Sequence, residues 1–191
     1  NIGGYLLVLS TLGLAVVLLV GAALLMGMLR NLQAVDPGFR SANVLRAHFT
    51  LPDSRYPSSF ADYPNWPVIQ QFNRDVVREM GPLPGVQSAA IAFNHPLERG
   101  FTNSFQIEGL AYDPSQGEMT TRMVTPGYFE TVGVRVLEGR VFDATDDEDS
   151  EGVVVINREA MERYFPDGNA VGGGIRFWGP TYRRVIGVVE N

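Results

Sequence analysis

The sequence contains no cysteine and no lysine, and it has only two histidines, His48 and His95. Without cysteine the chain forms no disulfide, no thiolate zinc site and no cysteine nucleophile. Its basic residues are all arginines, whose planar guanidinium can hold a carboxylate through two hydrogen bonds. Two histidines without metal-ligand spacing are typical of surface positions, so the sequence predicts no metal site.

The charge balance disfavours nucleic acid as a partner. Fifteen basic and 21 acidic residues give a net charge of −6, whereas phosphate binding needs a basic face. Much of the hydrophobic content lies in the first thirty residues, and the rest amounts to about one ordinary domain. The chain begins with Asn1 and ends at Asn191 directly after an apolar run, and we interpret it as a fragment.

The first thirty residues predict a transmembrane helix over 1–30. Residues 2–29 contain no charged side chain, which exceeds the roughly 20 apolar residues that a spanning helix needs. A signal peptide would have a basic start, a shorter apolar core and a cleavage site of small residues. Ala23 and Gly27 are spaced as in helix-packing motifs, but small residues are common in bilayer helices. Arg30 and Arg40 weakly favour a cytoplasmic location for the side that follows.

After a connector over 31–43, which includes the turn Asp36-Pro37-Gly38, residues 44–191 predict one α+β domain because strands and helices mix without strict alternation. Apolar residues at four-residue spacing predict a helix over 68–80 after a proline-rich loop over 52–67. Thr125 and Asn157 are the expected N-caps of helices over 126–132 and 158–164. Strands are predicted over 44–51, 85–93, 104–108, 119–124, 134–137, 153–156, 175–178 and 184–189, the last two as a hairpin.

No pattern in the sequence predicts a catalytic, cofactor or metal site. An acidic stretch over 143–151 offers oxygen ligands for calcium, but it lacks the EF-hand order and is expected to be a solvated loop. Its acidic residues are Asp143, Asp146, Asp147, Glu148, Asp149 and Glu151. The run Gly172-Gly173-Gly174 lacks the lysine and helix of a phosphate loop. Glu98, Glu108 and Glu138 show no pairing in the sequence, and no serine-nucleophile motif is present.

A series of short blocks runs in the same order as in a known family. The connector Val35-Asp36-Pro37-Gly38-Phe39 after an uncharged helix is the first of them. The blocks cover 30–39, 83–90, 105–109, 122–133, 137–142, 153–157, 163–166 and 185–189. This chain resembles MacB-like ABC transporter permeases, most closely the second half of the large duplicated permeases. It departs from them at Gly172-Gly173-Gly174, where a basic residue is expected near the third glycine.

The resemblance implies an extracytoplasmic core domain, expected to have two lobes, inserted after the first helix of a four-helix permease unit. The expected location is the bacterial inner membrane, with the domain outside, against the weak indication of Arg30. The implied partners are a cytoplasmic ABC ATPase subunit, other permease helices or a second permease half, and a periplasmic adaptor. ATP hydrolysis on the separate subunit would move the helices and the outer domain, so this chain is expected to be neither an enzyme nor a cofactor binder.

Two other classes of protein remain open. A single-span sensor or ligand-binding domain would have a signalling domain before Asn1 and a concave pocket. An anchored envelope enzyme would depend on His48 or His95. The aromatic residues Tyr56, Tyr63 and Trp66 are candidates for a docking surface, although packing against the domain explains them equally.

Overall fold

The computed structural model describes residues 2–34, 38–40, 42–59, 66–94, 98, 100–147, 149–177 and 179–191. It divides the chain into two compact units, Asn1–Pro37 and Gly38–Asn191.

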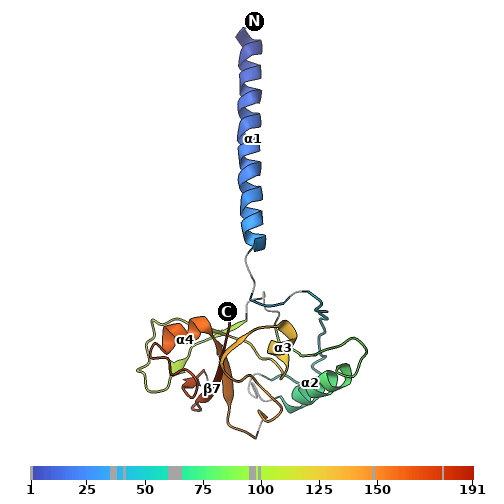
Figure 1. Cartoon of the computed structure of the whole chain (residues 1–191), viewed down its shortest axis with the longest axis vertical. Helices are drawn as coiled ribbons and strands as arrows, with labels where there is room; N and C mark the ends of the chain where they lie inside the picture. Colours follow the sequence, from blue (N-terminus) through green and yellow to red (C-terminus); the bar gives the residue numbers. More distant parts are fainter. Residues whose placement is uncertain are drawn as a thin grey trace. The chain divides into compact units, whose positions relative to one another are not determined.

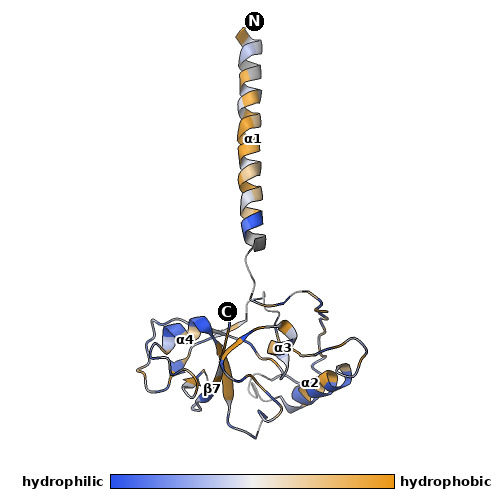
Figure 2. Cartoon of the chain, viewed as in Figure 1, coloured by the Kyte–Doolittle hydropathy of each residue, from blue (hydrophilic) through white to orange (hydrophobic). Residues whose placement is uncertain are grey.

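The first unit is the helix α1, Ile2–Ala34. Within it, Ile2–Asn31 is long and apolar enough to cross a membrane, on the criteria of length and composition. Thirty residues of α-helix measure about 45 Å, more than the roughly 30 Å of bilayer hydrocarbon. Figure 2 shows orange and pale colours along α1 and the strong blue of hydrophilic residues only near its last turns. The predicted helix is present and extends four residues into the predicted connector, whose Asp36 and Pro37 lie outside the described residues.

The second unit is built around a mixed five-stranded sheet with the order β2-β6-β7-β4, in which β5 also pairs with β7. Its strands are β2 (Gln106–Ile107), β4 (Val136–Gly139), β5 (Val153–Asn157), β6 (Gly174–Arg176) and β7 (Arg183–Val189). β5 runs parallel to β7, and the other neighbours are antiparallel. This mixed sheet with its helices confirms the predicted α+β class.

Strand β7 lies at the centre of the unit, as Figure 1 shows. β5 pairs along it from Arg184 to Val189, while β6 pairs with its first residues and β4 with its last. A strand with neighbours on both edges and packing on both faces favours a nearly continuous apolar sequence. Val185 and Val188 are accordingly fully buried.

The hydrophobic core lies where α4 (Arg158–Tyr164) packs on this sheet. Its buried residues are Phe105, Ile107, Ile156, Ala170, Ile175, Val185 and Val188. The ring of Phe105 meets Tyr164 of α4 edge-on, with 4.8 Å between ring centroids. The Asn157 side chain accepts a hydrogen bond of 3.1 Å from the backbone N–H of Ala160, which confirms the predicted N-cap.

The helix α2, Pro67–Met80, confirms the prediction over 68–80. Pro67 occupies its first turn, where a missing N–H costs nothing. The ring of Phe72 packs edge-on against Phe49 and Tyr56, at centroid distances of 5.6 and 5.2 Å. Trp66 donates a hydrogen bond of 2.9 Å to the carbonyl of Ser59. Tyr56 and Trp66 thus have contacts within the domain, and Tyr63 lies outside the described residues.

The N-cap predicted at Thr125 is wrong. The helix α3 spans Tyr128–Val132 and follows Gly127, which adopts a φ of 83° and provides no side-chain cap. The Thr125 hydroxyl instead accepts a hydrogen bond of 2.9 Å from the backbone N–H of Ile91. A hydroxyl that bonds a neighbouring segment is lost to its own helix, and local sequence does not reveal that competition.

Two predicted strands are also corrected. Residues 44–51 form no strand, and Leu45 is 93% exposed. The alternation of apolar and polar residues leads to a half-buried strand only where a neighbouring strand provides hydrogen-bond partners. Within 85–93 there is one isolated bridge, Ala92 to Val124.

Other boundaries shift by a few residues. β2 is shorter than 104–108, β4 begins two residues later than predicted, and the hairpin β6–β7 is confirmed. A separate two-stranded sheet pairs β1 (Phe101–Asn103) with β3 (Met119–Thr121). The sequence predicted β3 as the longer strand 119–124 and missed β1, because a three-residue strand with two polar residues carries no alternation signal.

Candidate functional site

The structure describes one of the two histidines and does not place it in a site. His48 is exposed in the extended segment after the first unit, and His95 lies outside the described residues. Among the residues that the structure describes, no group of three or more histidine, aspartate or glutamate side chains is placed to hold a metal ion.

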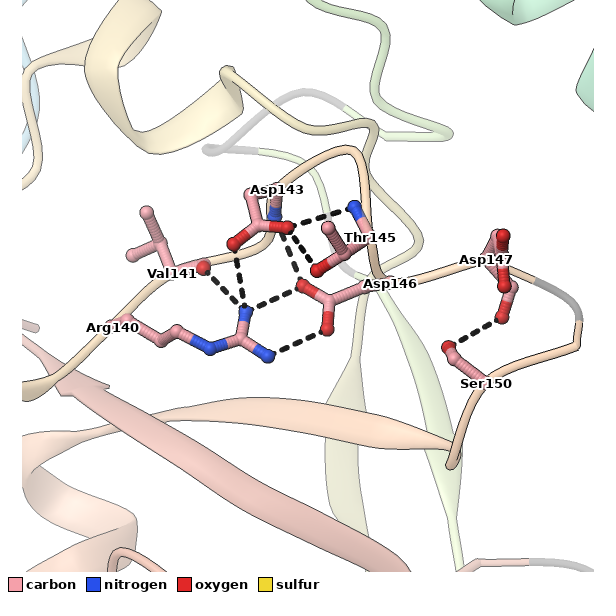
Figure 3. A network of polar contacts seen from close by, with 7 residues as sticks. All are labelled: Arg140, Val141, Asp143, Thr145, Asp146, Asp147 and Ser150. Carbon is pink, nitrogen blue, oxygen red and sulfur yellow. Dashed lines mark hydrogen bonds and ion pairs between the residues drawn. The ribbon is translucent and has the colours of Figure 1, made fainter.

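The acidic stretch closes around an arginine that sequence reasoning did not single out (Figure 3). Arg140 donates two hydrogen bonds to the carboxylate of Asp146, at 2.6 and 2.8 Å, and a longer one of 3.4 Å to Asp143. Asp143 also accepts hydrogen bonds from the backbone N–H and the hydroxyl of Thr145, at 2.8 and 2.5 Å. Glu148 lies outside the described residues. The guanidinium thus occupies the position that a bound cation would take between the two carboxylates.

The electrostatics of this loop follow from those contacts. The hydrogen bond from Arg140 holds the pKa of Asp146 below its ordinary value, and the hydrogen bonds from Thr145 lower the pKa of Asp143. The same bond to Asp146 raises the pKa of Arg140. The signal in the sequence was an arginine three and six residues before two aspartates, directly after a strand.

The glycine run after α4 serves packing and pairing. Gly172 donates a hydrogen bond of 2.8 Å to the carbonyl of Val185, and its own carbonyl accepts one of 2.8 Å from Arg184. A Cβ on Gly174 would lie less than 3.0 Å from the carboxylate of Glu108. The run therefore forms a close turn into β6, and its N–H groups are not arranged around an anion.

One concave surface is lined by both apolar and polar side chains, including Ile107, Tyr164, Arg163 and Asp113. The Asp113 carboxylate already accepts hydrogen bonds from the N–H and hydroxyl of Ser115, at 2.8 and 2.6 Å, which lower its pKa. This polar group is satisfied within the chain, so the groove does not by itself indicate a ligand.

A second polar arrangement joins residues 38–40 and 190–191 to the segment 132–135 and to α4. Here the terminal junction denotes residues 38–40, the turn 132–135, the start of α4 and residues 190–191. The backbone N–H of Arg40 donates a hydrogen bond of 2.6 Å to the carbonyl of Val132. The backbone N–H of Glu190 donates one of 2.9 Å to the carbonyl of Arg135. Residues 38–40 and 190–191 are thus both hydrogen-bonded to the same four-residue segment, 132–135.

Side chains reinforce the junction. The carboxylate of Glu190 pairs with Arg135 through one oxygen and with Arg158 at 2.6 Å through the other. The Asn191 side chain accepts a hydrogen bond of 3.0 Å from the backbone N–H of Glu159, in the first turn of α4. These pairs span 55 and 32 residues, and sequence reasoning identified none of them because no local pattern joins positions so far apart.

Two glycines permit the close approach at the junction. Gly133 has a φ of 69°, and a Cβ there would lie 3.0 Å from the Cβ of Arg40. Gly38 has a φ of 76°, and a Cβ there would lie less than 3.0 Å from the backbone carbonyl oxygen of Asn191. Positive φ is easily adopted only by glycine, so both the backbone conformation and the space favour glycine here.

Comparison with known proteins gives one family and several similar solved structures. The family described as MacB-like periplasmic core domain matches residues 6–191. No curated protein matches the chain. The periplasmic region of MacB from Actinobacillus actinomycetemcomitans is 20% identical, with 71% of this chain and 58% of that chain covered and a TM-score of 0.46. The extracellular domain of the noncanonic ABC-type transporter YknZ from Gram-positive bacteria is 18% identical, with 63% and 58% covered and a TM-score of 0.44.

The chain spans 58% of the length of each of these two structures. The family match includes most of α1 together with the whole of the second unit. A match over nearly all of the sequence identifies this chain as a member of the family of MacB-like periplasmic core domains.

Proposed function

We propose that this chain is part of a permease subunit of an ABC-type exporter or mechanotransmission complex. In this proposal α1 spans the bacterial inner membrane and residues 38–191 lie outside it. A partner subunit in the cytoplasm hydrolyses ATP, and the movement of the membrane helices displaces the outer domain. The chain itself has no catalytic role.

The observation that carries the proposal is the single family match over 6–191, which joins an apolar helix of spanning length to a periplasmic core domain. The division of the chain that goes with it is a spanning helix over 1–30, a connector over 31–43 and the core domain over 44–191. The hydrogen bond from Arg40 to Val132 and the closeness of Gly38 to Asn191 support counting the end of that connector with the domain.

The partners in this proposal are an ABC ATPase subunit, further permease helices or a second permease half, and a periplasmic adaptor. Purification of the full-length protein from its native membrane in mild detergent, followed by an ATPase assay, tests the first of these. We expect a co-purifying ATPase whose activity depends on this subunit. A preparation without a nucleotidase would contradict the proposal and favour a single-span sensor.

The location of the domain has its own test, because the chain has no cysteine. Ser54 is exposed, and a Ser54→Cys variant places a single thiol on the domain. A membrane-impermeant maleimide should label this variant in intact spheroplasts. The cysteine-free parent is the matched control, and labelling only after lysis would place the domain in the cytoplasm and refute the proposal.

A further inference from the structure

We propose that the outer edge of β5 binds an extended segment of a partner protein, which adds a strand to the five-stranded sheet. The segment that fits this edge has alternating apolar residues and a basic residue at the end beside Asp147 and Asp149. This inference goes beyond the permease assignment and does not depend on an ATPase subunit.

The strand register places β5 alone along one edge of β7. Arg184 of β7 pairs with both β5 and β6, and Val188 of β7 pairs with both β5 and β4. A strand has only two edges, so β6 and β4 share one edge of β7 and β5 occupies the other. In the described part of the chain no further strand pairs with β5. Its outer side is therefore an edge of the sheet.

Every second residue of β5 turns its backbone N–H and C=O away from β7. The N–H of Arg184 donates a hydrogen bond of 2.8 Å to the carbonyl of Gly152, so the even-numbered residues face β7. The register shift in this pair adds its extra residue to β7, and the alternation along β5 continues. The N–H and C=O groups of Val153 and Val155 thus point outward, and no hydrogen bond joins them to another described segment.

The strand β5 has none of the features that usually keep an edge from pairing. Its sequence is Val-Val-Val-Ile-Asn, without proline and without a charged side chain, whereas edge strands are commonly protected by charge, proline or a bulge. Val153 and Val155 are half-buried and lie on the sheet face opposite the buried Ile156. An added strand would cover these two side chains and satisfy their backbone groups at the same time.

The charges next to β5 select a basic segment. Of the acidic residues that precede β5, Glu151 already pairs with Arg184 at 3.3 Å. Asp147 accepts a hydrogen bond of 3.1 Å from the backbone N–H of Asp149. Neither of these two aspartates pairs with an arginine among the described residues. An arginine or lysine at the matching end of the added strand would neutralise them.

A second copy of this chain fits the edge less well than a basic partner. In a parallel arrangement its acidic stretch would lie beside the same stretch of the first copy, and like charges that face each other destabilise a strand pair. In an antiparallel arrangement the stretch would lie beside the start of α4. There Arg158 already pairs with Glu190 at 2.6 Å, and Glu159 is exposed.

Peptide binding to the full-length protein in phosphatidylcholine nanodiscs tests the proposal. The probes are fluorescein-labelled peptides of alternating threonine and valine, with two arginines placed either before or after this stretch to allow both strand directions. Fluorescence anisotropy is read against empty nanodiscs. We expect saturable binding of one arginine peptide. The matched peptide with glutamates in place of the arginines should bind about tenfold more weakly. N-methylation of alternate amides in the arginine peptide should weaken its binding at least about tenfold, because it removes the donors that pair with β5.

Two changes in the protein locate the site. Val155→Pro removes an N–H that has no partner in β7, a position where an edge strand tolerates proline, and it should weaken binding at least about tenfold. Replacing Asp147 and Asp149 together by asparagine keeps the backbone and should weaken binding of the arginine peptide about fivefold. Asp53→Asn is the matched control, because Asp53 is exposed and precedes the sheet in the chain; it should leave binding unchanged.

Three results would overturn the proposal. The first is the absence of saturable binding, as expected if another segment or a second copy already covers the edge. The second is equal binding of the arginine and glutamate peptides. The third is binding that withstands both N-methylation and the double asparagine variant, a comparison that stays decisive even if Val155→Pro does not fold. Each of these results leaves the permease proposal standing, because none of them concerns ATP hydrolysis.

Discussion

Gly187 lies where β7 pairs closely with the end of β4, and its substitution by alanine tests this part of the sheet. Gly187 pairs with Gly139 of β4 and with Val155 of β5. A Cβ on Gly187 would lie less than 3.0 Å from the carbonyl oxygen of Arg140. The obstacle is the backbone of Arg140, so no side-chain rotation relieves the clash.

The expected cost has two parts. Forcing β4 away from β7 breaks the hydrogen bond of 2.9 Å from the N–H of Arg140 to the carbonyl of Ile186, worth about 1 kcal/mol. Overpacking a well-filled site adds about 2 kcal/mol. We expect Gly187→Ala to lower the free energy of unfolding by about 3 kcal/mol. For a unit of this size that corresponds to a fall in melting temperature of roughly 10 °C.

The assay is thermal unfolding of the complete chain in detergent micelles, followed by tryptophan fluorescence. The two tryptophans, Trp66 and Trp178, belong to the second unit, so the signal does not report on α1. Gly81→Ala is the control because Gly81 has a helical φ of −55° and a Cβ there would meet its nearest atom at 3.7 Å. This control should be neutral or stabilising by about 0.5 kcal/mol. Equal melting temperatures for the two variants would refute the close approach of β4 and β7.

Three further substitutions test the core, a helix cap and the acidic loop. Phe105 is 2% exposed, and Phe105→Ala should lower the free energy of unfolding, measured in urea, by about 4 kcal/mol. Leu110 is 55% exposed, and the control Leu110→Ala should change that free energy by no more than about 0.5 kcal/mol. Asn157→Ala removes the cap of α4 and should cost about 1 kcal/mol, with Asn157→Asp restoring most of it; equal stability of all three proteins would contradict the cap. Asp146 has a lowered pKa in the folded state, so its ionised form stabilises the fold above about pH 4 and that stabilisation is lost as the pH falls through the folded pKa. Asp146→Asn should therefore be less stable than the wild type by about 1 kcal/mol at pH 7, and melting curves at pH 7 and pH 3 should show that difference shrinking; a constant difference would contradict the ion pair.

Elements with a strong local signal were predicted correctly from the sequence. The long uncharged run predicted α1 and the spacing of apolar residues predicted α2. Asn157 marked the start of α4, and the apolar runs predicted β5 and the hairpin β6–β7. In each of these elements the side chains near in sequence decide the backbone conformation. The ordered blocks also identified the family that the match over 6–191 establishes.

Only the tertiary structure decided the elements and contacts that depend on distant partners. The alternating segment 44–51 forms no strand, and the hydroxyl of Thr125 bonds Ile91 in place of capping a helix. Arg135 and Glu190, 55 residues apart, meet because β4 and β7 are neighbours in the sheet. Sequence patterns show which face of a segment is apolar. Which group hydrogen-bonds a given backbone N–H or C=O, or pairs with a given charge, depends on how the whole domain packs.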